Sequence, residues 1–289
     1  QVVDAQAQPR IEIIDLDQAG EPEAALRSAL AAAAQQRFAL GRAPMIALSL
    51  FWLGPQRAVL HLIASHLVFD GWAASSFLAE LAAAYRAQSQ GLALPLVPGE
   101  SPIAFAAAER ARFDSPEAAA DRVFWLETLR EPPAALSLGD REPTGARQFG
   151  ADTLQLRFDG PLVAALRTLM KRERCTLFPL LLSATATAIQ RLSGRADFVL
   201  SLPYASQALE RHPALLADGV LDLPLRLRLP VNAQVGAALA PVRAALMDAL
   251  EHPRMTQGLA ARALGLVSRG ERAPLSGVFF NLNPRVDLS

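Results

Sequence analysis

Apolar, β-prone residues gather in three short runs in the first part of the chain. These strand-like runs cover residues 11–16, 44–54 and 56–66. The last two runs are separated by Gly54-Pro55, a dipeptide that favours a tight turn. We therefore predict one strand followed by a β-hairpin.

Apolar residues at helical spacing mark longer runs between and after these strands. Residues 17–38 are Ala-rich and amphipathic, and residues 72–90 repeat apolar side chains near every third or fourth position up to Gly91. Residues 103–130 have the same character, with a break around Ser115-Pro116. These runs predict helices that cover a sheet.

A stretch rich in proline and glycine divides the chain. We predict an N-terminal lobe over residues 1–131, an interlobe linker over 132–150 and a C-terminal lobe over 151–289. In the second lobe we expect strands at 152–160, 197–205, 222–230 and 275–284, and helices at 161–174, 176–194, 234–250 and 256–266. The fold class is therefore α/β with mixed sheets, in two lobes.

Composition excludes several classes of protein. Lys and Arg total 28 and Asp and Glu total 28, so nothing indicates binding to nucleic acid or to an anionic membrane. Apolar residues make up 52% of the chain, ample for a buried core, but no apolar run is long enough to span a membrane. The N-terminus has no signal-peptide architecture. We expect a soluble cytoplasmic protein, or a piece of one.

Metal and thiol chemistry find little support in the sequence. Cys175 is the only cysteine and opens an apolar run, so a small buried hydrophobe is favoured over a nucleophile. Among the four histidines, His61, His212 and His252 are interpreted as packing or loop residues, and no pair has metal-binding spacing. We predict no metal site and no cofactor bound by the chain itself.

The strongest candidate for chemistry is the stretch "SHLVFDGW", residues 65–72. A strand-like run leads into His66, and a helix-like run starts at Asp70-Gly71. A neutral imidazole can accept a proton near pH 7, and a helix N-terminus stabilises developing negative charge. Asp70 has two options: a helix N-cap, or a buried ion-pair partner that fixes the loop. Spacing alone is also compatible with an ordinary polar turn.

The wider chain resembles the condensation domains of nonribosomal peptide synthetases, whose core pattern is H-H-x-x-x-D-G, often followed by Trp. Further stretches are similar in the family's order: "ERARFDSPEAAADRVFWLETL", "SGRADFVLSLPYASQ", "LLADGVLDLPLRLRL", "EHPRMTQGLAARALGL" and "APLSGVFFNLNP". The resemblance implies a two-lobed chloramphenicol-acetyltransferase-like fold. It also implies amide-bond formation between two thioesters carried on phosphopantetheine arms, which meet at the motif histidine in the cleft between the lobes.

On this resemblance, His66 would position or deprotonate the attacking amine and stabilise the tetrahedral intermediate. Ser65, Asp70, Gly71 and Trp72 would support the motif, with Asp70 structural and Gly71 allowing close backbone approach. The second-lobe candidates are Gln207, Arg211 and Asn281.

The sequence departs from the family pattern at several positions. Ser65 replaces the first histidine, and Asp222 stands where the family has Asn. Gln207 ends the turn where the family often has the arginine that pairs with the motif aspartate. The family's salt bridge to Asp70 is therefore not expected from Gln207, and the sequence leaves open whether Arg195 or Arg211 replaces that arginine. Segments at both ends of the family domain are absent, which predicts that these residues are an incomplete excerpt, inactive and prone to aggregate when expressed alone.

Three functions remain open. The first is an amide-forming condensation domain, of the mixed polyketide–peptide type, whose partners are donor and acceptor carrier proteins and adjacent adenylation or polyketide synthase modules. The second is an ester-forming or CoA-dependent acyltransferase of the same superfamily. The third is a non-catalytic, carrier-binding or partner-binding domain. Gly71-Trp72 favours the first, and retention of His66 counts against the third.

Overall fold

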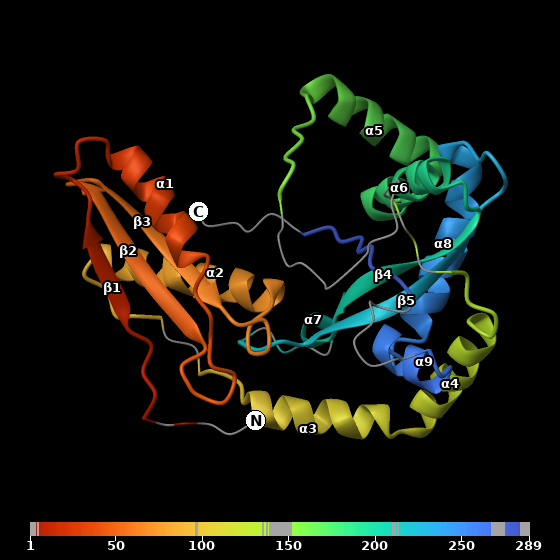
Figure 1. Ribbon diagram of the computed structural model, residues 1–289, viewed down its shortest axis with the longest axis horizontal. Coiled ribbons are helices and arrows are strands. Elements are labelled where there is room, and N and C mark those ends of the chain that lie inside the picture. The colour runs from red at the N-terminus through yellow and green to blue at the C-terminus, as the bar shows by residue number, and fades with distance from the viewer. Residues whose placement is uncertain are drawn as a thin grey trace, which may run out of the picture. The chain divides into compact units, whose positions relative to one another are not determined.

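The computed structural model describes residues 4, 6–95, 98–134, 136, 138, 152–209, 212, 214–266 and 275–283. Its helices and strands follow one another as shown in Figure 1: β1 (Ile11–Asp15), α1 (Pro22–Ala33), β2 (Ile46–Gly54), β3 (Arg57–Ala64), α2 (Gly71–Ser89), α3 (Pro102–Phe113), α4 (Pro116–Thr128), α5 (Gly160–Glu173), α6 (Leu177–Ser193), β4 (Asp197–Ala205), α7 (Ser206–Leu209), β5 (Val220–Arg228), α8 (Val235–Glu251) and α9 (Gln257–Ala263). The predicted α/β class is confirmed.

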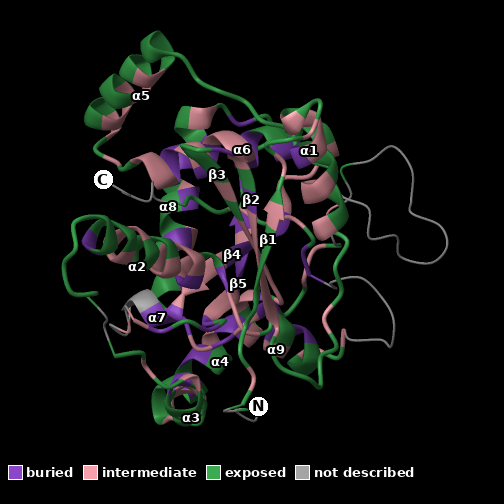
Figure 2. Ribbon diagram, turned by 90° about the vertical axis from the view of Figure 1, so that its left-hand side faces the viewer, coloured by how far each residue is buried: buried purple, intermediate pink, exposed green. Residues whose placement is uncertain are grey.

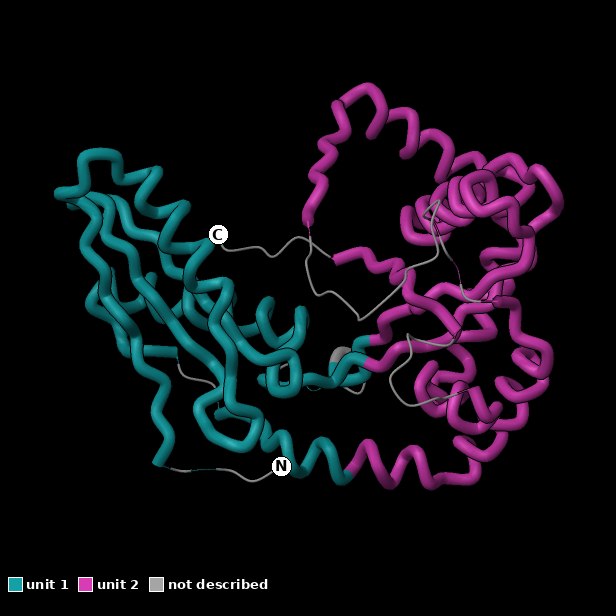
Figure 3. The backbone as a smooth tube through the Cα atoms, in the orientation of Figure 1, with its two compact units in different colours: residues 1–107, 205–220, 286–289 teal, residues 108–204, 221–285 magenta. Residues whose placement is uncertain are grey.

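The chain forms two compact units (Figure 3), and one of them is discontinuous in sequence. The first unit comprises residues 1–107 and 205–220, and the second comprises 108–204 and 221–285. The segment 205–220 runs from the last residue of β4 to the first residue of β5, and it belongs to the same unit as the N-terminal part of the chain. The predicted linker at 132–150 lies largely outside the described residues, so the proposed lobe boundaries stay a prediction.

The first unit is built on a mixed three-stranded sheet in the order β1-β2-β3. β1 pairs with β2 in parallel, which requires the crossover that α1 supplies, and β2 pairs with β3 antiparallel through the predicted hairpin at Gly54. Phe51 on β2 is buried, whereas the next residue, Trp52, is partly exposed, as expected where successive side chains point to opposite faces. β3 ends at Ala64, directly before the candidate motif.

The second unit has its core around β4 and β5. The two strands are the most continuously buried elements (purple in Figure 2) because apolar side chains point inward from both: Phe198, Leu200, Leu202, Leu223, Leu225 and Leu227. The helices α6 and α8 pack together over this core. Gln190 of α6 is buried and satisfied, since its amide donates to the carbonyl of Pro230 and accepts from the Ala233 amide.

One ion pair ties the two core strands together at their ends. The guanidinium of Arg226 donates twice to the Asp197 carboxylate, at 2.9 and 2.6 Å, and once to the carbonyl of Thr128 at 2.7 Å. These hydrogen bonds hold the pKa of Asp197 below its usual value. The pair therefore stabilises the fold while Asp197 is ionised, and its contribution is lost as pH falls through that lowered pKa.

Two predicted strands are wrong. Residues 152–159 have no strand partner among the described residues and lie as irregular chain with Leu154, Leu156 and Phe158 exposed. In the run at 275–284, the described residues 275–283 make only an isolated parallel bridge between Phe279 and Ser201 on β4. The run at 152–160 alternates as strands do, but alternation makes a strand only where a neighbouring strand completes the hydrogen bonds.

Within the described ranges, no single helix combines the length and apolar character needed to cross a membrane. The helices α5 and α6 reach that length only when taken together, and they are bent by 102° at the break between them.

Candidate active site at the start of α2

The candidate motif forms a short turn between β3 and α2. The amide of Ser65 donates to the carbonyl of Met45 at 2.9 Å, which continues the pairing with β2 for one residue beyond the strand. The Ser65 carbonyl and hydroxyl then accept from the amides of Val68 and Leu67, at 3.1 and 3.4 Å. Ser65 is thus a turn-forming residue here, and the turn places His66 just outside the sheet.

His66 is open to solvent. Its side chain is 76% exposed, and its Nδ1 lies 3.5 Å from Oδ2 of Asp218. Among the described residues, this is the only polar contact recorded for the imidazole, so the structure leaves Nε2 accessible. Asp218 was not among the predicted site residues; the only signal was its place in "LLADGVLDLPLRLRL", where Asp-Gly precedes a strand.

Asp70, four residues after His66, is buried and fully engaged. Its Oδ1 accepts from the Ala73 amide at 2.8 Å, which makes it the N-cap of α2. Its Oδ2 accepts from the Gly219 amide at 2.9 Å and from Nε2 of Gln207 at 2.5 Å. We call these four residues the Asp70 clamp. The carboxylate is N-cap and loop anchor at once, and both oxygens are occupied by donors from the protein.

The side-chain partner of Asp70 is Gln207, which stands where the family often has arginine. Within the described part of the chain, the side-chain amide of Gln207 donates to Asp70, so a charge–neutral hydrogen bond stands where the family often has an ion pair. Of the two arginines considered as replacements, Arg195 donates to the carbonyl of Ala134, and Arg211 lies outside the described residues.

Gly219 is required by close packing. A Cβ at this position would lie 2.5 Å from Oε1 and 2.8 Å from Cδ of Gln207, distances that real Cβ atoms do not adopt. Gln207 is fully buried, and its Oε1 has no hydrogen-bond partner among the described residues. The Gln207 amide is therefore packed against the Gly219 backbone, with its donor end directed at Asp70.

The other motif residues make fewer contacts. Nothing in the described chain lies within 4 Å of a Cβ built on Gly71, so the structure shows no close approach of protein backbone there. The indole nitrogen of Trp72 is buried without a hydrogen-bond partner among the described residues. Asn281 belongs to the second unit, where its amide donates to the side chain of Asn283 at 2.9 Å.

Within the first unit, a second contact holds the 205–220 segment to residues 1–107. Glu100, just before α3, interacts with Nδ1 of His212 and accepts from the Ala214 amide at 3.2 Å. The His212 ring also meets Phe105 edge-on at 5.3 Å between centroids, and Phe105 packs with the buried Leu215. The segment that carries Asp218 is therefore attached at two separate points.

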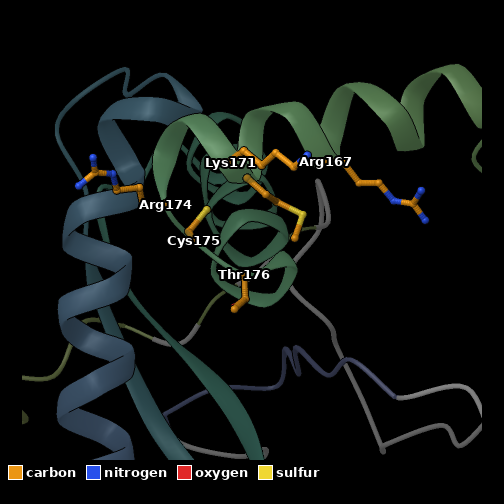
Figure 4. Close-up of a pocket in the computed structure, with 6 residues that line it drawn as sticks. Arg167, Lys171, Arg174, Cys175 and Thr176 are labelled. Carbon is orange, nitrogen blue, oxygen red and sulfur yellow. The ribbon is translucent and has the colours of Figure 1, made fainter.

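A cavity elsewhere in the structure is a weaker candidate. It has about 410 Å³ and lies where α5 meets α6, lined by Arg167, Met170, Lys171, Arg174, Cys175 and Thr176. Figure 4 shows the side chains of Arg167 and Arg174 pointing away from each other, so the cations do not converge on one point. No group of three or more potential metal ligands occurs in the described ranges.

The geometry at the start of α2 suits proton transfer. One imidazole is accessible, a carboxylate faces its Nδ1, and the first turn of a helix begins a few residues away. A neutral imidazole held at Nδ1 can accept a proton at Nε2, and unpaired amides at a helix N-terminus favour negative charge nearby. Asp70 is not available for proton transfer because its oxygens are hydrogen-bonded inside the clamp.

Comparison with known proteins gives one consistent family. The family description "Condensation domain" matches residues 1–287. The chain is 28% identical over 288 residues to Malpibaldin synthetase of Mortierella alpina, and 32% identical over 221 residues to Phosphinothricin tripeptide synthetase PhsC of Streptomyces viridochromogenes. The first condensation domain of the calcium-dependent antibiotic synthetase, solved with a substrate analogue, has the same fold, with a TM-score of 0.82 at 24% identity.

These matches cover most of this chain but only part of each relative. The aligned region is 95% of this chain and 5% of Malpibaldin synthetase, and 75% of this chain and 20% of the tripeptide synthetase. For the solved condensation domain the figures are 96% and 63%.

Proposed function

We propose that this chain, which belongs to the condensation domain family, forms an amide bond between a carrier-bound acyl or peptidyl thioester and a carrier-bound amino acid. The donor and acceptor would each be held on the phosphopantetheine arm of a carrier domain, and the neighbouring modules would be adenylation or polyketide synthase modules. The relative named a tripeptide synthetase supports a place in peptide assembly. The predicted cytoplasmic location and mixed polyketide–peptide subclass stay predictions.

The observation that carries the proposal is the contrast between His66 and Asp70. His66 is exposed beside the N-terminus of α2, while both carboxylate oxygens of Asp70 accept hydrogen bonds from the protein itself. A site with one accessible base and one structural acid fits attack of an amine on a thioester. It does not fit a reaction that needs two mobile carboxylates.

The proposed step conserves atoms and protons. The acceptor nitrogen attacks the donor thioester carbon, forming the C–N bond while negative charge builds on the carbonyl oxygen. Nε2 of His66 accepts the proton that the nitrogen loses. Collapse of the tetrahedral intermediate breaks the C–S bond, and the proton passes to the departing thiolate of the donor arm. The acyl group ends on the acceptor carrier as an amide.

The test is transfer between loaded carriers by the full polypeptide that contains this chain. The donor carrier bears an acyl group, and the acceptor carrier bears either an aminoacyl group or the matched hydroxyacyl group. We expect the acceptor's intact mass to rise by the acyl mass with the amino acceptor, and at least tenfold faster than with the hydroxy acceptor. Preference for the hydroxy acceptor or for free coenzyme A would favour the acyltransferase alternative. No transfer to any acceptor, with carriers still bound, would favour the non-catalytic one.

A further inference from the structure

His66 and Asp218 approach each other although 152 positions separate them in the sequence. The contact joins Nδ1 of His66 to Oδ2 of Asp218 at 3.5 Å, and the two side chains are 76% and 32% exposed. Even a charged pair this exposed contributes only about 0–1 kcal/mol to stability. Stability is therefore a poor explanation for the placement of this carboxylate.

The Asp70 clamp accounts for the approach. Asp70 lies four residues after His66, at the end of the same turn, and Gly219 directly follows Asp218. The hydrogen bond from the Gly219 amide to Asp70 therefore brings Asp218 to the imidazole. The Gly219 carbonyl accepts from the Ser206 amide at 3.2 Å, which closes the base of the 205–220 segment. The backbone on both sides of the pair is thus fixed before any substrate binds.

The identity of the histidine nitrogen that faces Asp218 also matters. A carboxylate beside Nδ1 of a neutral imidazole favours the tautomer protonated at Nδ1, and in that tautomer Nε2 is the proton acceptor. In free histidine the two neutral tautomers compete, and only the one with unprotonated Nε2 can accept a proton there. A distance of 3.5 Å is long for a hydrogen bond, but catalytic hydrogen bonds often shorten only when substrate is bound.

We propose that Asp218 is a positioning residue for His66, which selects the tautomer protonated at Nδ1 and fixes the ring so that Nε2 meets the acceptor amine. The inference rests on the proposed function, because it assigns His66 the role of base. The same arrangement gives Asp70 an indirect role: it docks the backbone that delivers Asp218, and makes no contact with the reacting atoms.

The first test measures turnover in the full polypeptide. Asp218→Asn keeps the shape of the side chain and removes its charge, and Asp218→Glu keeps the charge. Since misplacement of a catalytic group by about 1 Å can cost 10²-fold, we expect Asp218→Asn to lower the single-turnover rate roughly 10- to 10²-fold. The KM for the acceptor carrier should stay within twofold, and Asp218→Glu should recover part of the rate.

The second test reports the tautomer without any substrate. Iodoacetamide alkylates the unprotonated imidazole nitrogen, and the position of the adduct on His66 is determined after digestion. We expect the Nε2 adduct to predominate in the wild type, and the Nδ1 share to rise in Asp218→Asn. Glu100→Gln is the matched control, because it loosens the same segment at its other attachment. It should lower thermal stability and leave the position of the adduct unchanged.

The outcomes separate the two proposals. An Asp218→Asn rate within twofold of wild type, in a polypeptide that does form the amide, would overturn the role of Asp218. An unchanged adduct position in Asp218→Asn would overturn it as well. If no amide forms but the adduct position still depends on Asp218, the pairing stands and the proposed function fails.

Discussion

Replacement of His66 by alanine is expected to slow amide formation by roughly 10²–10⁴, the usual contribution of a positioned acid–base group. The variant should fold normally, because the imidazole is largely exposed and its contact with Asp218 adds little to stability. The measurement is the single-turnover rate of acyl transfer between loaded carriers, with thermal melting as the check on folding.

His61 provides the matched control for this variant. It lies on β3, five residues before His66, opposite Ser49 of β2 and away from the motif turn. We expect His61→Gln to leave the rate within about threefold of wild type. A His66→Ala rate within a factor of two of wild type would show that His66 has no catalytic role, and that positioning of the two substrates accounts for the rate.

Replacement of Asp70 by alanine is expected to be the most destabilising change in the site. It removes the cap from α2 and leaves two buried donors, the Gly219 amide and the Gln207 side chain, without an acceptor. A lost cap costs about 0.5–2 kcal/mol, and each unsatisfied buried group about 1–3 kcal/mol. We expect a loss of about 3–5 kcal/mol in the free energy of unfolding, measured by denaturant titration.

Asp70→Asn should be milder for a specific reason. Asparagine can keep the cap on the Ala73 amide, but its NH₂ would face two donors. Gln207 has an unpaired Oε1, so a flip of its amide would supply an acceptor for that NH₂. The Gly219 amide and the turned Gln207 NH₂ would then lack acceptors, as in Asp70→Ala, but the cap of α2 would be kept. We expect a loss of about 1–3 kcal/mol. Equal losses in the two variants would contradict this account of the clamp.

Gly219→Ala disturbs the same clamp from the other side. The added methyl would overlap Gln207, which is buried and has no room to retreat. Adding Gln207→Ala should restore part of the stability lost in Gly219→Ala, because it removes the overlapping atoms. Strict additivity of the two substitutions would show that the overlap is not the cause.

The sequence predicted the local elements well where a single segment decides the outcome. The hairpin at Gly54, α2 from Gly71, and β4 over residues 197–205 all follow from periodicity and turn residues. The prediction of a strand at 152–160 was wrong because a strand also needs a neighbouring strand to pair with. The alternation within one segment does not show whether such a neighbour exists.

The candidate site was predicted only in part for the same physical reason. His66 and Asp70 belong to one turn and share a visible pattern, and the N-cap role of Asp70 was one of the two options considered. Asp218 and Gly219 were missed because their place beside the motif depends on hydrogen bonds between segments that are far apart in the sequence. Such contacts produce no recognisable pattern of residues along the chain. An Asp-Gly pair before a strand indicates an ordinary turn.

The central claim, that carrier-borne substrates react at His66, is tested most directly by covalent capture. An acceptor carrier is loaded with a pantetheine arm that ends in a bromoacetamide, mixed with the full polypeptide, and the adduct is located by tandem mass spectrometry. Cys175 is an internal comparison, because a thiol reacts faster than an imidazole with this group when neither is favoured by proximity. Our account predicts an adduct on His66 that forms much faster from the loaded carrier than from the free arm. An adduct on Cys175, with His66 unmodified, would contradict it.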